Sequence, residues 1–195
     1  HFRPDYTCWH VISYNNDGTV ESKQTFQGKD DDSSWARGQA WAIYGYTACF
    51  RETNDSIFLN FAKDIADMII DRVKTEDAIP YWDYDAPVTK ETPRDVSAAS
   101  VTASAMIELS TMVPDGQKYL DYAEKILKSL SSDAYLAKVG DNQGFILMHS
   151  VGSLPNGSEI DTPLNYADYY YLEALKRFME LKKLRVENGE LRVIQ

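Results

Sequence analysis

The sequence has little of several residue types on which common protein classes depend. Its 195 residues include 2 cysteines and 3 histidines, and 20 lysines and arginines face 30 acidic residues, for a formal net charge of −10. Two cysteines cannot build a disulfide scaffold, and no C-x-x-C pair is present. A chain this acidic lacks the clustered basic face that nucleic acids require, so we expect no nucleic-acid partner. No apolar run approaches the roughly 18 residues of a membrane span, so we expect no membrane partner.

Metal motifs are also missing. The acidic run at residues 30–32 lacks the D-x-D-x-D-G spacing of a calcium loop, and H-E-x-x-H does not occur. We therefore expect no metal site. The chain begins at His1 without a charged and apolar leader, and we interpret it as truncated or processed.

Aromatic residues, in contrast, are abundant, with 13 Tyr, 7 Phe and 4 Trp in a chain that is 44% apolar. Tyr and Trp combine a flat apolar face with a polar tip, which suits sugar-binding clefts as well as protein cores. The length is sufficient for one domain with a substantial core.

Local patterns predict a hairpin followed by five helices. Apolar and polar residues alternate on both sides of residues 15–18, a strong turn signal, so a hairpin is expected within 8–27. Ser33 and Ser34 are candidate caps for a helix over about 35–51. Further helices are expected after Asp55, from about Val96, and over about 117–130 and 165–183. Long loops are expected at 78–95 and 133–162, and a strand or frayed end at 187–195.

These helices fall into two alternating types. Those that begin near residues 35, 97 and 165 are rich in small and aromatic residues and follow long loops, so they should be buried on both sides. The two between them are charged and amphipathic. This alternation predicts an all-α fold of inner and outer helices, an (α/α)6 barrel of which the chain supplies about half. The loops before the inner helices should form a cleft at one end.

The segment WARGQAW, residues 35–41, opens the first inner helix at this end. Trp35 shares a side with Gly38 and Gln39, whereas Trp41 lies about 600° further round the helix and should point elsewhere. An arginine near a helix N-terminus gains nothing from the helix dipole, so Arg37 should face a carboxylate. That carboxylate belongs either to a ligand or to residues 30–32. A tryptophan ring could stack on a sugar or fill the core.

Several stretches together resemble one family. QG-x5-SWARGQAWAIYGY (Gln27 to Tyr46) is similar to the unsaturated glucuronyl hydrolases, glycoside hydrolase family 88. The same holds for HFRPDYTCWHVISY, IPYWDYDAP, PRDVSAASVTASA, GFILMHSVGS and EIDTPLNYADYYYLEALKR. The match follows the family's order across nearly the whole chain, and it covers the C-terminal half of the family's single barrel domain.

The resemblance implies an activity. The substrate would be an oligosaccharide from a polysaccharide lyase, ending in a 4-deoxy-hex-4-enuronic acid. Hydration of its C4=C5 bond, with a proton to C4 and water to C5, gives a hemiketal that collapses and releases the sugar. No metal or organic cofactor is implied. This chemistry needs a carboxylic acid that gives and takes a proton. The family's acid/base aspartate and its partner lie upstream of the matched region, so we expect neither in residues 1–195.

The resemblance carries over the binding half of the site instead. It implies that His10 assists at the substrate carboxylate or reacting carbon, and that further residues bind the unsaturated uronate, namely Gln27, Trp35, Arg37, Trp41 and His149. Packing or loop hydrogen bonds could also explain each of these. Weaker candidates for ligand contact are Trp82, Tyr84, Arg94, Asp95, Ser97, Asn165 and Tyr166.

Alternatives remain open at this point. One is an unsaturated rhamnogalacturonyl hydrolase with the same barrel, and another is a non-catalytic carbohydrate-binding half-barrel. A sugar 2-epimerase is disfavoured, because His10 and His149 fall outside the inner helices. The chain's net charge repels an anionic sugar, so binding must depend on local groups. We expect a periplasmic or secreted location, with the cytoplasm as the alternative, and an N-terminal half as a second candidate partner.

Overall fold

Five α-helices and one β-hairpin form the structure, a computed structural model that describes residues 1–187. The helices are α1 (Ala36–Thr53), α2 (Ser56–Arg72), α3 (Val96–Ser110), α4 (Gln117–Leu130) and α5 (Asn165–Glu187), and a 3-10 turn spans Asn142–Gly144. All five predicted helices are confirmed, and α5 continues past its expected end. The tail predicted at 187–195 lies outside the described residues, except for Glu187.

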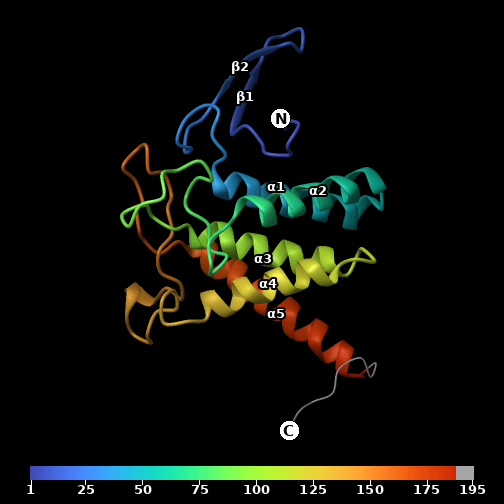
Figure 1. The fold of residues 1–195 in the computed structure, drawn as a ribbon, viewed down its shortest axis with the longest axis vertical. Coiled ribbons are helices and arrows are strands. Elements are labelled where there is room, and N and C mark those ends of the chain that lie inside the picture. The colour runs from blue at the N-terminus through green and yellow to red at the C-terminus, as the bar shows by residue number, and fades with distance from the viewer. Residues whose placement is uncertain (188–195) are drawn as a thin grey trace.

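The predicted hairpin is also confirmed. Strands β1 (Val11–Tyr14) and β2 (Val20–Gln24) pair antiparallel and project from the body of helices (Figure 1). Gly18 has a φ of +85°, which an L side chain rarely adopts, and its N–H donates to the Asn15 carbonyl at 2.9 Å. The turn at Gly18 therefore lies within residues 15–18, as predicted from the sequence.

The cap of α1 differs from the prediction. Trp35 is the N-cap and makes no side-chain capping bond, so neither Ser33 nor Ser34 has the predicted role. The first helical N–H, that of Ala36, donates to the carbonyl of Trp82 at 3.1 Å. A distant loop thus satisfies the helix end that local side chains were expected to satisfy.

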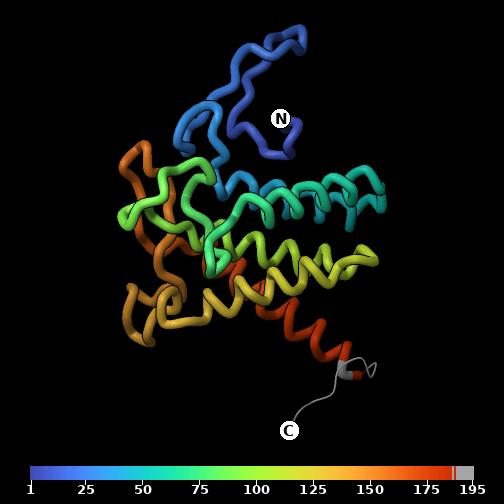
Figure 2. Tube along the Cα trace, viewed as in Figure 1, coloured from blue at the N-terminus to red at the C-terminus, as the bar shows by residue number. Residues whose placement is uncertain are grey.

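The helices alternate between two layers, as predicted. In the inner layer α3 lies between α1 and α5, while α2 packs on α1 and α4 packs on α3 from the outer side (Figure 2). The expectation that all inner helices are buried on both sides is correct only for α3, which buries 13 of its 15 residues. On the flanking helices Trp41 of α1 is 36% exposed and Tyr169 of α5 is 60% exposed. These two helices are the edges of the layer, so one side of each lacks a neighbouring helix within residues 1–187.

Small side chains on α3 allow its neighbours to meet over it. Ala98 and Val101 of α3 form a buried cluster with Ala36 and Ala40 of α1. Tyr44 of α1 and Tyr170 of α5 cover this cluster, and their ring centroids lie 5.1 Å apart in an edge contact. The alanine-rich sequence of α3 is therefore a packing requirement of the inner layer.

The loops before the inner helices gather at one end of the molecule (Figure 2). Single β-bridges join Trp35 to Asp83 and Tyr81 to Arg94, and the first N–H of α3 donates to the carbonyl of His149. The predicted clustering of loops is confirmed. We call this end the rim.

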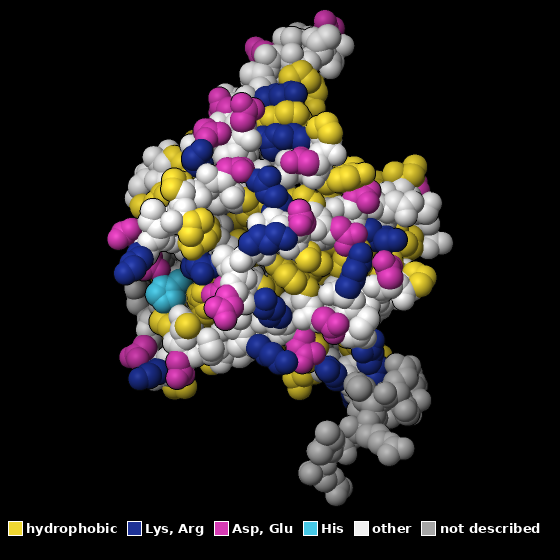
Figure 3. All heavy atoms as spheres, viewed as in Figure 1, with side chains coloured by type: hydrophobic (Ala, Val, Ile, Leu, Met, Phe, Trp, Pro, Cys, Tyr) yellow, Lys and Arg dark blue, Asp and Glu magenta, His cyan; other side chains and the backbone are white. Residues whose placement is uncertain are grey.

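Charges of both signs are interspersed over the outer face that carries α2 and α4 (Figure 3). Lys118 at the start of α4 pairs with Asp67 of α2 at 2.7 Å, for example. In the part of the chain that the structure describes, no helix has the length and apolar character needed to cross a lipid bilayer.

A glycine between α3 and α4 gives a first stability prediction. A Cβ on Gly116 would lie 2.0 Å from the carbonyl oxygen of Ser110, whereas a Cβ on Gly45 of α1 would meet nothing within 4 Å. Gly116→Ala should therefore destabilise the protein by about 1–3 kcal/mol through overpacking. Gly45→Ala should be neutral or stabilise it by up to ~1 kcal/mol through helix propensity. Urea unfolding of both variants checks this, and equal effects would contradict the packing of the α3–α4 turn.

Candidate functional site

Arg37 lies at the centre of the rim and is almost completely buried, with 3% of its surface exposed. One terminal nitrogen donates to Asp95 Oδ2 at 2.9 Å, to Ser97 Oγ at 3.1 Å and to the carbonyl of Val151. The other donates to the carbonyl of Gly152 at 2.8 Å. The guanidinium therefore joins the start of α1 to the start of α3 and to the loop that precedes α5.

The carboxylate that Arg37 faces is part of the protein. Asp95 is the N-cap of α3, where its Oδ1 accepts hydrogen bonds from the Ser97 N–H and hydroxyl at 3.1 and 2.6 Å. Its other oxygen takes the ion pair with Arg37, and Asp95 is fully buried. The alternative that Arg37 pairs with residues 30–32 is therefore wrong, because its partner is Asp95. A direct contact between Arg37 and a substrate carboxylate stays a prediction.

Trp35 supports the rim from inside. Its ring lies 4.5 Å from the ring of His10 and 4.5 Å from the guanidinium carbon of Arg37, and the residue is 7% exposed. Trp82, Ala86 and Val151 belong to the same buried cluster as Trp35. The stacking of a sugar on Trp35 stays a prediction, and in the structure the ring lies against His10 and Arg37. The predicted neighbourhood of Trp35 is confirmed, since Gly38 packs on its ring and Gln39 donates to its carbonyl.

His10 and Gln27 are brought together beside Trp35. The Nδ1 atom of His10 accepts from the backbone N–H of Gln27 at 3.2 Å. The side-chain amide of Gln27 donates to the carbonyl of Gly152 at 2.7 Å, the same oxygen that Arg37 contacts. Burial, followed by the positive charge of Arg37, lowers the pKa of His10 below its ordinary value of 6.5. Four of the six predicted site residues thus form one connected cluster, which we call the rim cluster: His10, Gln27, Trp35 and Arg37.

Trp41 and His149 lie apart from the rim cluster. Trp41 packs edge-on against Tyr44 and Tyr170 on the inner layer, so it does point away from Trp35 as the helical spacing predicted. The Nδ1 atom of His149 lies 2.5 Å from Asp161 Oδ1, and its backbone has a φ of +67°.

His149 lines a cleft of about 580 Å³ on the rim. Trp82 and Leu154 also line this cleft, and both pack against the cluster around Trp35. The cleft is thus next to the rim cluster and does not contain it.

Some of the weaker candidates for ligand contact also lie at the rim, and others lie elsewhere. Trp82 is 5% exposed and packs at the rim, in agreement with the packing interpretation. Arg94 donates to Asp77 and covers the ring of Tyr81. Tyr84 packs against the buried cores, and Asn165 begins α5. Tyr166 lies 5.3 Å from the guanidinium carbon of Arg37, so α5 also contacts the rim cluster.

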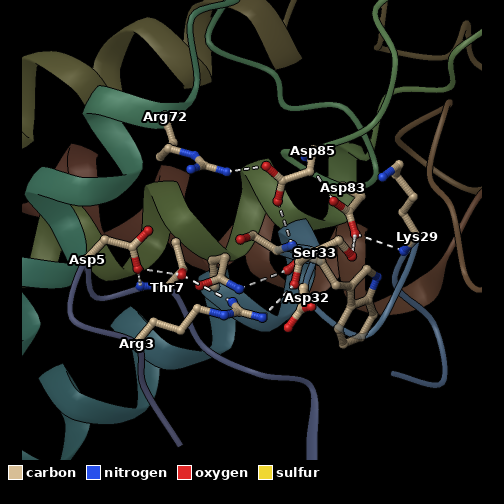
Figure 4. A network of polar contacts seen from close by, with 12 residues as sticks. Arg3, Asp5, Thr7, Lys29, Asp32, Ser33, Arg72, Asp83 and Asp85 are labelled. Atoms are coloured by element: carbon tan, nitrogen blue, oxygen red, sulfur yellow. Dashed lines mark hydrogen bonds and ion pairs between the residues drawn. The ribbon is translucent and has the colours of Figure 1, made fainter. Parts of the chain in front are cut away.

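Asp83 and Asp85 are organising residues that the sequence did not reveal. Asp83 is 1% exposed and accepts from Lys29 N–H at 2.9 Å and from the Ser33 hydroxyl at 2.7 Å. Asp85 accepts from Ser34 N–H and from Arg72 (Figure 4). These carboxylates fasten the loop before α1 to the loop before α3. The available signal was the pair of carboxylates placed between aromatic residues in the WDYD stretch.

Within residues 1–187, no three His, Cys, Asp or Glu side chains come together as metal ligands would. Paired inner and outer helices with the candidate site residues at a loop-rich end define the class as a helical toroid of α/α type, of which residues 1–187 supply five helices.

Comparison with known proteins identifies the family that the chain resembles. No family model matches the chain. The unsaturated glucuronyl hydrolase of Formosa agariphila is 47% identical over 182 residues, which are 92% of this chain and 45% of that protein. The unsaturated chondroitin disaccharide hydrolase of Streptococcus pyogenes is 32% identical over 90% of this chain and 45% of its own length. A crystal structure of an unsaturated glucuronyl hydrolase specific for heparin has a TM-score of 0.92 and 57% identity, over 94% of this chain and 50% of that one.

The chain is therefore similar, over nearly its whole length, to about half of an unsaturated glucuronyl hydrolase. The family resemblance predicted from the sequence is confirmed. The predicted fold class, about half of an (α/α)6 barrel with a small hairpin, is confirmed as well. The chain spans about half the length of the relatives it matches.

Proposed function

We propose that residues 1–195 form the C-terminal half of a single (α/α)6-barrel catalytic domain that hydrates the terminal unsaturated uronate of polysaccharide-lyase products. The observation that carries this proposal is that the similarity reaches glucuronyl hydrolases over 92% of the chain and coincides with one connected rim cluster. The names of relatives refer to glucuronyl, chondroitin and heparin substrates, which supports a glycosaminoglycan-type oligosaccharide. The reaction uses no metal or organic cofactor in this proposal.

In this proposal some of the candidate residues stabilise the rim and others contact the substrate. Trp35 and Arg37 are too buried to offer much surface, so they hold the rim in shape and place a positive charge behind it. His10 and Gln27 are the more accessible members of the rim cluster, and they contact the uronate in this proposal. Trp41, which lies apart from the cluster on α1, contacts it as well in this proposal. His149, in the cleft beside them, contacts the sugar that follows. The proton donor comes from an upstream half of the barrel, which is the second partner of this chain.

Two other functions are less well supported. The names of the relatives favour the glucuronyl over the rhamnogalacturonyl substrate. A non-catalytic carbohydrate-binding half-barrel would bind the same sugars and leave them unchanged. A periplasmic or secreted location, with the cytoplasm as the alternative, is part of the proposal.

Binding by Trp41 offers the test of this function. Trp41→Leu removes an aromatic face that is 36% exposed, and should weaken binding of an unsaturated glucuronyl disaccharide about tenfold, equivalent to ~1.4 kcal/mol. Isothermal titration calorimetry measures this. Tyr14→Leu, at an exposed aromatic of the hairpin that is 54% accessible, is the matched control and should leave the affinity unchanged. If both variants bind as the unaltered protein does, Trp41 is not at the sugar site.

A further inference from the structure

The Nδ1 atom of His10 is surrounded by hydrogen-bond donors. The backbone N–H groups of Phe26 and Gln27 point at it from 3.1 and 3.2 Å. An amide N–H can only donate, so each of these contacts requires a lone pair on Nδ1. The hydroxyl of Thr25 lies 3.2 Å away and already accepts from the N–H of Gly28 at 2.8 Å, which leaves its own hydrogen for Nδ1.

This surrounding fixes the chemical form of the ring. If Nδ1 carried a proton, that proton would point at two backbone N–H groups, which cannot accept a hydrogen bond. The imidazolium form, which has a proton on Nδ1, is therefore disfavoured. A neutral imidazole with an unprotonated Nδ1 carries its proton on Nε2. The ring of Trp35, tilted by 33° at 4.5 Å, restrains the plane of the imidazole.

We propose that His10 is held as a neutral imidazole whose Nε2–H donates a hydrogen bond to the bound uronate, and that Gln27 is the residue that positions it. His10 therefore acts neither as a cation that pairs with the substrate carboxylate nor as a general base through Nδ1. The proposal rests on the proposed function for the identity of the ligand, and on the contacts of Nδ1 alone for the form of the ring.

Gln27 has this role because it is held at both ends. Its backbone N–H contacts His10, while its side chain donates to the Gly152 carbonyl, which the Arg37–Asp95 pair also holds in place. Gln27 thus connects the imidazole of His10 to the Gly152 carbonyl, which the Arg37–Asp95 pair holds in place. Loss of the Gln27 side chain should release the segment that presents the two N–H groups.

The electrostatic surroundings act in the same direction. Arg37 of α1 is the charged group that acts on the ring, and Thr25, Gln27 and Trp35, which contact it, are uncharged. A lowered pKa in the folded protein means that stability is lost as the pH falls below 6.5, where the unfolded chain takes up a proton and the folded chain resists it. The loss ends once the pH falls below the folded value.

Nuclear magnetic resonance of protein labelled with 15N-histidine tests the form of the ring directly. We expect the His10 nitrogens to show an unprotonated Nδ1 and a protonated Nε2 at neutral pH, with titration below 6.5. An Nδ1–H tautomer, or titration at or above that value, would overturn the proposal. This measurement needs no variant and no ligand.

A matched pair of variants tests the positioning role. Gln27→Leu should produce a mixture of tautomers and raise the pKa of His10 toward 6.5. Gln24→Leu, the same change at an exposed position in β2, should alter neither property. Unchanged His10 signals in Gln27→Leu would remove Gln27 from the proposal. Equal changes in both variants would show a general disturbance of the hairpin, and would also overturn it.

The ligand is tested separately. Addition of an unsaturated glucuronyl disaccharide should shift the Nε2–H proton of His10 downfield, while Nδ1 stays unprotonated. A fixed tautomer without any shift on addition would reject the substrate contact and the proposed function, and would leave the assignment of the ring standing. A shift accompanied by protonation of Nδ1 would support the function and overturn the donor role.

Discussion

Replacement of Arg37 by methionine is expected to lower the free energy of unfolding by about 3–5 kcal/mol, because it leaves the carboxylate of Asp95 buried without its counter-ion. The two side chains are 3% and 0% exposed, and their oxygen–nitrogen distance is 2.9 Å. The same change removes the donors to two carbonyls of the loop before α5. Methionine preserves much of the side-chain volume, so the loss reports mainly on charge and hydrogen bonds. Urea unfolding monitored by circular dichroism measures it.

Arg51→Met is the matched control on the same helix. Arg51 pairs with Glu52 and Glu108 but is 44% exposed, and exposed ion pairs contribute roughly 0–1 kcal/mol. The two variants should therefore differ by several kcal/mol. Comparable losses would mean that the Arg37–Asp95 pair is not the buried contact described for the rim.

The second large effect concerns catalysis. Residues 1–195 alone are expected to leave an unsaturated glucuronyl disaccharide intact, because the proposed proton donor lies outside them. Loss of a general acid or base typically lowers a rate by about 10²–10⁴-fold, and here half of the barrel wall is absent as well. The conjugated C4=C5 bond absorbs in the ultraviolet, so the decay of this absorbance measures turnover.

The Formosa agariphila relative supplies the controls for this assay. The whole relative should consume the absorbance, and its region that matches this chain, about 45% of its length, should not. Addition of the remaining part of the relative to residues 1–195 should restore some turnover if the halves associate. Turnover by residues 1–195 without any addition would show that they contain their own proton donor.

Periodicity and loop placement were enough to predict most of the fold. The small and apolar residues of 96–109 indicated a helix buried on both sides, and α3 has this property because both neighbouring inner helices are present in the chain. The same pattern gave a wrong expectation for α1 and α5. Burial depends on which surfaces are covered, and the sequence of a helix does not record whether its neighbour lies in the same chain.

The residues of the rim cluster could be named from the sequence, but the contacts that join them could not. The resemblance brought His10, Gln27, Trp35 and Arg37 together, and they are connected in the structure. The partner of Arg37 could not be predicted, because Asp95 also has a complete local role as the N-cap of α3. A residue that satisfies one local rule gives no sign of a second, long-range contact.

The predicted cap of α1 failed for a related reason. Ser33 has the right chemistry for an N-cap, but the buried carboxylate of Asp83 takes its hydroxyl at 2.7 Å. The carbonyl of Trp82 then satisfies the helix N–H in its place. Competition between a local cap and a tertiary hydrogen bond depends on loop positions, which residue types alone do not determine.

A crystal structure with an unsaturated glucuronyl disaccharide bound would show whether the rim is the sugar-binding site. We expect the unsaturated ring to lie within contact of His10, Gln27 or Trp41, with the following sugar toward the cleft that His149 lines. An unsaturated ring bound elsewhere, for instance beside Tyr81 and Arg72 on the outer surface, would contradict it.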